Sequence, residues 1–69
     1  MKILLKQCST GLWLKPGGRW ESNPVNAREF ASSQEAILVS EESRLSGLNL
    51  CFLFDDRKLN FQMPARRAI

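Results

Sequence analysis

Residues 20–36 read Trp-Glu-Ser-Asn-Pro-Val-Asn-Ala-Arg-Glu-Phe-Ala-Ser-Ser-Gln-Glu-Ala and contain the point at which strand-like sequence gives way to a helix. Asn23-Pro24 ends the extended part, because the residue before proline avoids the helical region and proline donates no ladder hydrogen bond. Ser32 and Glu35 have the spacing of a capping box, in which the serine oxygen accepts from a backbone amide and the glutamate reaches back. The pattern predicts a helix that begins near Ser33.

The predicted helix runs to Leu45 and ends at Gly47, a residue suited to the left-handed conformation that follows many helices. Its apolar face is irregular, and its small residues form a stripe at helical spacing. They are Ala36, Val39, Ser40 and Ser43. Such a stripe favours close packing of the helix on a sheet.

Three strand-like segments precede the helix, at residues 2–8, 12–15 and 19–22. The turns between them are Ser9-Thr10-Gly11 and Pro16-Gly17-Gly18, where glycine accepts the positive φ that tight turns require. Alternation places Ile3 and Leu5 toward the core. The segments therefore predict hairpin-connected antiparallel strands.

Two further strand-like segments follow the helix, at residues 48–54 and 59–63. The first is apolar on both faces, as expected for a central strand. The second alternates with period two, which predicts that Leu59, Phe61 and Met63 point inward. The sequence thus predicts an α+β domain over residues 1–63, with an antiparallel sheet of four to five strands, one helix on one face and the order β-β-β-(β)-α-β-β. Residues 64–69 are expected to form a flexible tail.

Composition argues against several classes of protein. The chain has 69 residues, a net charge of +3, two cysteines and no histidine or tyrosine. Its apolar runs are far shorter than the ~20 residues that cross a bilayer, and its start lacks a signal cleavage site, so a cytoplasmic protein is expected. Without histidine or a Cys-x-x-Cys pair we expect no metal and no cofactor, and buried, reduced thiols at Cys8 and Cys51. With no usual general base, the chain is not expected to be an enzyme.

Trp13, Lys15, Arg19 and Trp20 are the candidate binding surface. If the Gly17-Gly18 turn closes a hairpin, two indoles and two cations lie near its tip, a combination that stacks bases and follows a phosphate backbone. The competing interpretation is that the tryptophans cover the small core while Lys15 and Arg19 solvate the turn.

The motifs Asn23-Pro24, Ala27-Arg28-x-Phe30 and Ser32-x-x-Glu35-Ala36, preceded by Trp20, resemble those of a group of short bacterial and phage-associated proteins with no established activity. The resemblance implies a small α+β fold and no functional residue. Residues 26–30 alone fit either a helical turn or an extended piece. The resemblance favours the extended form, with Phe30 packed just before the helix.

Together these features predict a small non-enzymatic binding module that acts through protein contacts, using a sheet face or an edge strand. The apolar second face of residues 48–54 raises the possibility of a homodimer. A single-stranded nucleic-acid-binding module that uses the hairpin surface is the alternative.

Overall fold

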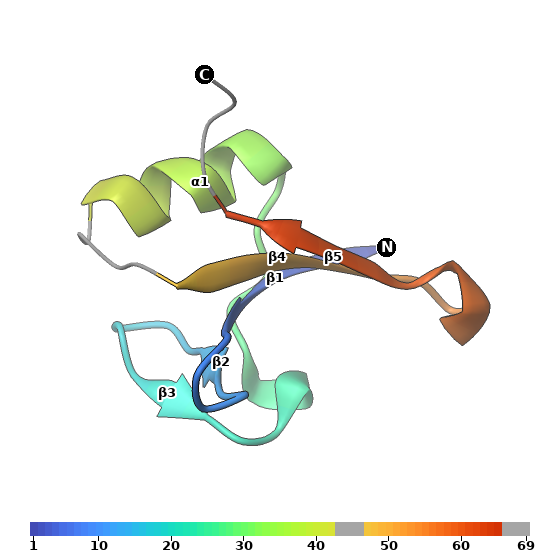
Figure 1. Ribbon diagram of the computed structural model, residues 1–69, viewed down its shortest axis with the longest axis horizontal. Helices are drawn as coiled ribbons and strands as arrows, with labels where there is room; N and C mark the ends of the chain where they lie inside the picture. Colours follow the sequence, from blue (N-terminus) through green and yellow to red (C-terminus); the bar gives the residue numbers. More distant parts are fainter. Residues whose placement is uncertain (43–46, 66–69) are drawn as a thin grey trace.

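The computed structural model describes residues 1–42 and 47–65, and shows a five-stranded antiparallel sheet with one helix across it (Figure 1). This confirms the predicted α+β class. The sheet order is β3-β2-β1-β4-β5, with β1 in the middle. In chain order the elements are β1 (Lys2–Gln7), β2 (Trp13–Leu14), β3 (Trp20–Glu21), the 3-10 turn η1 (Pro24–Asn26), α1 (Ser33–Glu42), β4 (Leu48–Leu53), the 3-10 turn η2 (Arg57–Leu59) and β5 (Phe61–Pro64).

The pairing of β1 with β4 organises the sheet. The two strands run antiparallel over their whole length, from Lys2 opposite Leu53 to Gln7 opposite Leu48. Directly opposed residues share a face of a sheet and successive residues alternate. One face therefore carries every second residue of each strand, namely Ile3, Leu5 and Gln7 of β1 and Leu48, Leu50 and Phe52 of β4.

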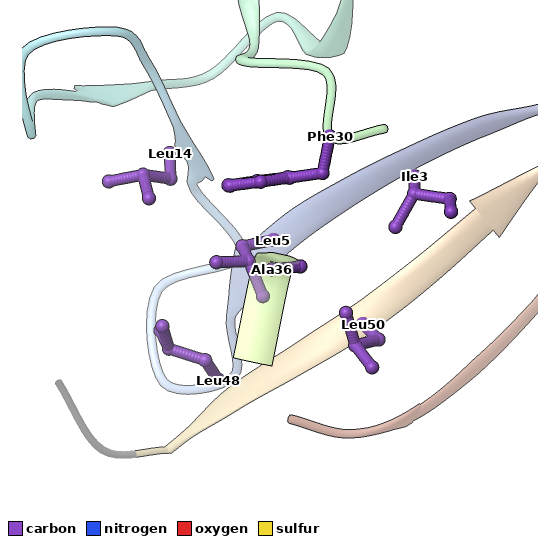
Figure 2. Close-up of a cluster of buried hydrophobic side chains, with 7 residues drawn as sticks. All are labelled: Ile3, Leu5, Leu14, Phe30, Ala36, Leu48 and Leu50. Atoms are coloured by element: carbon purple, nitrogen blue, oxygen red, sulfur yellow. The ribbon is translucent and has the colours of Figure 1, made fainter. Parts of the chain in front are cut away.

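The core lies between that face and α1. Figure 2 shows its seven buried side chains, Ile3, Leu5, Leu14, Phe30, Ala36, Leu48 and Leu50. α1 packs on β1 and β4, and Ala36 is fully buried against them. Ser40 is buried one turn later, and its hydroxyl donates to the carbonyl of Ile37 at 3.0 Å and contacts the carbonyl oxygen of Ala65 at 3.4 Å. The small residues at these two positions thus let the helix approach the sheet closely.

The helix begins at Ser33 as predicted, and the serine half of the capping box forms, while Glu35 reaches back to the residue before Ser32. The backbone N–H of Glu35 donates to Ser32 Oγ at 3.1 Å, and Glu35 Oε2 accepts from the backbone N–H of Ala31 at 3.0 Å. Glu35 Oε1 also lies 3.5 Å from Arg28 Nη2. The predicted last turn falls on residues 43–46, which lie outside the described residues. Gly47 has the expected positive φ of 68°.

The segment before the helix differs from the prediction in two ways. Pro24–Asn26 forms a 3-10 turn, because the side chain of Asn23 accepts from the backbone N–H of Val25 at 3.0 Å and caps it. Residues 28–30 form neither a helix nor a ladder strand. The N–H of Arg28 donates to the Leu14 carbonyl and that of Phe30 to the Ile3 carbonyl, at 2.8 and 2.9 Å. These bonds hold Phe30 in the core, where packing was expected.

The flexible tail was predicted to begin at residue 64, but the ordered structure continues past this point. Pro64 is the last residue of β5, and Ala65 packs on the core while its N–H donates to the Leu48 carbonyl at 3.0 Å. The ordered body therefore extends through Ala65. The remainder of the expected tail, residues 66–69, lies outside the described part of the chain.

Candidate binding surface

The β2–β3 hairpin carries the four residues that the sequence singles out. The turn at Gly17 and Gly18, which have φ values of 87° and 79°, brings Lys15 N–H to the Arg19 carbonyl at 2.7 Å. In the ladder that follows, Trp13 lies opposite Glu21 and Leu14 lies opposite Trp20. The predicted hairpin is therefore present, with one indole on each of its strands.

The two indoles lie on opposite faces of this hairpin. Trp20 is opposed to Leu14, which belongs to the core, and its own side chain packs against the core cluster. Trp13 is one residue from Leu14 and so points the other way, together with Lys15 and Glu21. The structure does not bring the predicted four residues together as one surface, and for Trp20 the core interpretation is correct.

On the Trp13 face, the Trp13 ring contacts a lysine and Lys15 is paired with a glutamate. Lys6 Nζ lies 5.2 Å from the centroid of the Trp13 ring, a cation–π contact. Lys15 Nζ lies 3.6 Å from Glu21 Oε2. The Asn23 backbone N–H, which donates to Glu21 Oε1 at 3.2 Å, and then Lys15, lower the pKa of the Glu21 carboxyl. Lys6 thus covers one face of the Trp13 ring, and Lys15 is partly neutralised by Glu21.

A partly exposed aromatic cluster lies at the β5 edge of the sheet, where the sequence predicted core residues. Phe52 packs against the core and Phe54 is half-buried, whereas Phe61 is exposed. The rings of Phe52 and Phe61 stack with centroids 4.5 Å apart and an interplanar angle of 11°, and Phe54 lies 6.4 Å from Phe61. Phe61 is 50% exposed and Met63, on the same face of β5, is 46% exposed. We call these four residues, Phe52, Phe54, Phe61 and Met63, the β5 patch.

The inward prediction for Phe61 and Met63 is half right. Met63 lies opposite Leu50 and Phe61 opposite Phe52, so both side chains are on the core face of the sheet. They stay exposed because α1 packs on β1 and β4, and a helix about 10 Å across covers roughly two strands spaced at ~4.8 Å. Leu59, also predicted inward, lies in η2 and is exposed. The sequence predicts up to five strands but only one helix, and one helix cannot cover them all. That comparison could have revealed this exposed surface.

The two cysteines are free, as expected, but only one is buried. Cys8 is exposed, which corrects its predicted burial. Cys51 is fully buried opposite Leu4, and burial raises the pKa of its thiol to about 11. Cys51 lies on the apolar second face that was the basis for expecting a homodimer, but because it is buried it offers no exposed surface there.

Other features of the described residues supply no convergent chemistry. An open pocket of about 630 Å³ mixes charges of both signs, with Lys2 and Arg57 near Glu29 and Asp55, and Lys2 Nζ is already 3.6 Å from Glu29 Oε1. Within residues 1–42 and 47–65 no group of three or more acidic or cysteine side chains is placed to hold a metal ion. No helix in those ranges is long and apolar enough to cross a membrane.

Comparison with known proteins adds no assignment. A scan against family models, a search of curated proteins and a search of solved structures each found no match. The resemblance based on Trp20 to Ala36 therefore stays a prediction, and the candidate site rests on the geometry described above.

Proposed function

We propose that this chain is a small non-enzymatic binding module that acts through protein contacts made by the β5 patch. The observation that carries the proposal is that Phe61 and Met63 lie on the core face of the sheet and are still about half exposed, although the ring of Phe61 stacks with those of Phe52 and Phe54. Exposed apolar clusters of this kind are uncommon on soluble domains and often mark contact sites. Aromatic residues and methionine are also enriched at protein interfaces.

The state of the thiols supports a non-enzymatic role. A nucleophilic cysteine needs a lowered pKa, whereas burial raises that of Cys51 to about 11. Cys8 is exposed but belongs to a chain with no histidine that could act as its base. The exposed β5 patch therefore fits a role in binding, whereas neither thiol is placed for nucleophilic catalysis.

A single-stranded nucleic acid is the alternative partner. Trp13, Lys6 and Lys15 lie near one another on one face of the sheet, which favours it. Trp20 packs on the core, and Lys15 is paired with Glu21, which weakens it. Quenching of tryptophan fluorescence by a single-stranded oligonucleotide, lost as salt rises, would support this partner in place of a protein.

The protein-contact proposal predicts position-dependent crosslinking. A photo-crosslinking amino acid replaces Met63 in one variant and Leu38 in a control, since both side chains are exposed to a similar extent, 46% and 44%. Expressed in the organism's own cells, the Met63 variant should give a protein adduct that the Leu38 variant does not. The captured protein is then purified and its affinity is measured by calorimetry.

Truncation at the centre of the patch should weaken that affinity. We expect Phe61→Ala to weaken binding by about tenfold or more, as central aromatic contacts often do, and Leu38→Ala to leave it unchanged. Equal adducts at positions 63 and 38, or an affinity that is the same for Phe61→Ala and wild type, would overturn the proposed function.

A further inference from the structure

The backbone of β5 limits what can dock beside it. Because Ala65 N–H donates to the Leu48 carbonyl, the alternation of an antiparallel ladder turns the backbone groups of Phe61, Met63 and Ala65 toward β4. The backbone groups of Gln62 and Pro64 then face the free edge of the sheet. This edge is where a further strand would pair.

Gln62 is the one residue of β5 that presents both a donor and an acceptor at that edge. Pro64 has no N–H, and the N–H of Asn60, just before the strand, already donates to the Arg57 carbonyl at 3.1 Å. A long extended peptide would find a single donor along the whole strand. The edge therefore favours a short pairing centred on Gln62.

A short pairing of this kind is satisfied by a second copy of the chain. When two antiparallel strands meet at the same residue, the two residues exchange both N–H···O bonds, so Gln62 of each copy satisfies the other. In that register Phe61 of each copy lies opposite Met63 of the other, on the face that carries Phe52 and Phe54. Cross-strand pairs of aromatic and apolar residues stabilise sheets.

The segment that would pair with a second copy carries no charge. Residues 59–65 read Leu-Asn-Phe-Gln-Met-Pro-Ala and contain no charged residue, although the chain carries a net charge of +3. The paired segment itself therefore brings no like charges together, although basic residues flank it on both sides in the sequence, at 57–58 and 66–67. The side chain of Gln62 stays on the other face, where its Oε1 accepts from Asn49 Nδ2 at 3.2 Å.

We propose that two copies of the chain pair through β5, antiparallel about a two-fold axis at Gln62, and that the β5 patches cover one another. The inference rests on the proposed function and names the partner of the same surface. Since the two-fold pairing uses the free edge of β5 in both copies, the pairing closes at a dimer. The contact is small compared with the roughly 1,200–2,000 Å² of stable interfaces, so we expect a dissociation constant on the order of 0.1 mM.

Sedimentation equilibrium from about 10 µM to about 1 mM, a range chosen around that constant, tests the dimer. The average mass should rise above the 7.9 kDa of one chain toward twice that value. Met63→Lys, which places a charge opposite Phe61 of the second copy, should weaken dimerisation by about tenfold or more. Leu38→Lys is the matched control and should leave it unchanged.

Amide hydrogen exchange tests the register without any substitution. The N–H of Gln62 should exchange several-fold more slowly at the high concentration than at the low one, whereas that of Met63, which faces β4, should be protected at both. A mass of one chain at every concentration would overturn the dimer. A dimer in which the exchange rate of the Gln62 N–H is the same at both concentrations would overturn this pairing.

These outcomes are separate from those of the proposed function. A strictly monomeric chain that still crosslinks another protein through position 63 keeps the function and removes the second copy as its partner. A chain that is monomeric and gives no adduct specific to position 63 removes both.

Discussion

Cys51 shows how one buried group makes the stability of the chain depend on pH. Its side chain has no exposed surface and lies on the face of the sheet turned away from α1. Burial disfavours the thiolate and raises the pKa of the thiol from 9.0 to about 11. Between these two values the unfolded chain releases the proton while the folded chain keeps it. The free energy of unfolding must therefore fall as pH rises through this range.

Replacing Cys51 should remove that alkaline loss. We expect the wild-type chain to lose about 2 kcal/mol more stability than Cys51→Ala between about pH 8 and about pH 11. Urea unfolding at both pH values measures the difference, and any cavity left by the alanine cancels because it is present at both. Cys8→Ala is the control and should keep the wild-type loss, since Cys8 is exposed. An equal loss in wild type and Cys51→Ala would contradict this account.

The start of α1 depends on local contacts more than on its apolar face. Ser32 accepts from the N–H of Glu35, which has no partner within the helix, and Glu35 accepts from the N–H of Ala31 just before the helix. Arg28 also links Glu35 to the preceding segment. Only Ala36 and Ser40 of the helix are buried. A helix of ten residues is marginal by itself, so its first turn depends on these caps and on packing against the sheet.

Removing the capping hydroxyl should destabilise the whole domain. We expect Ser32→Ala to lower the free energy of unfolding by about 1 kcal/mol, because the backbone N–H of Glu35 loses its acceptor. Ser33→Ala, one residue later in the first turn, is the control and should change it by less than about 0.5 kcal/mol. Urea denaturation followed by circular dichroism distinguishes the two, and an equal effect of both substitutions would contradict the capping role.

At the scale of single elements, the sequence predicted the features that depend on residues close together in the chain. Ser32 and Glu35 located the helix start, and alternation placed Ile3 and Leu5 in the core, because capping and strand parity act over a few residues. Parity also put Phe61 on the correct face. It could not show that α1 fails to reach β5, since the cover over a strand depends on elements distant in the sequence.

The candidate site was harder to predict for the same reason. Trp13 and Trp20 were expected to act together because they flank one turn. Whether they share a face depends on the ladder register, Trp13 opposite Glu21 and Leu14 opposite Trp20, which a glycine turn alone does not fix. The exposed β5 patch escaped prediction because its residue types are those of a core.

At the scale of the whole molecule, a small core carries the fold. Nine hydrophobic residues are buried among those described, and the cluster in Figure 2 joins β1, β2, β4, α1 and Phe30. A chain of this length gains only about 3–10 kcal/mol on folding at the usual value per residue. The contribution of one core side chain is therefore a large share of the total free energy of folding.

Truncating a core leucine should bring the chain close to unfolding. Leu50 is 1% exposed at the centre of β4, and we expect Leu50→Ala to cost about 2–5 kcal/mol through lost burial and the cavity left behind. Leu38, 44% exposed on α1, is the matched control, and Leu38→Ala should stay within about 0.5 kcal/mol of wild type. Thermal unfolding followed by tryptophan fluorescence compares them, and similar losses at both leucines would contradict the assigned core.

The pairing of β1 with β4 also bears on how the chain is made. The closest paired positions, 7 and 48, are separated by β2, β3 and α1, so β1 cannot complete its main ladder until β4 has been synthesised. At roughly 5–20 residues per second, translation leaves β1 without that partner for several seconds. The chain therefore acquires its central ladder late in synthesis, and the apolar run from Ile3 to Leu5 has no β4 partner until then.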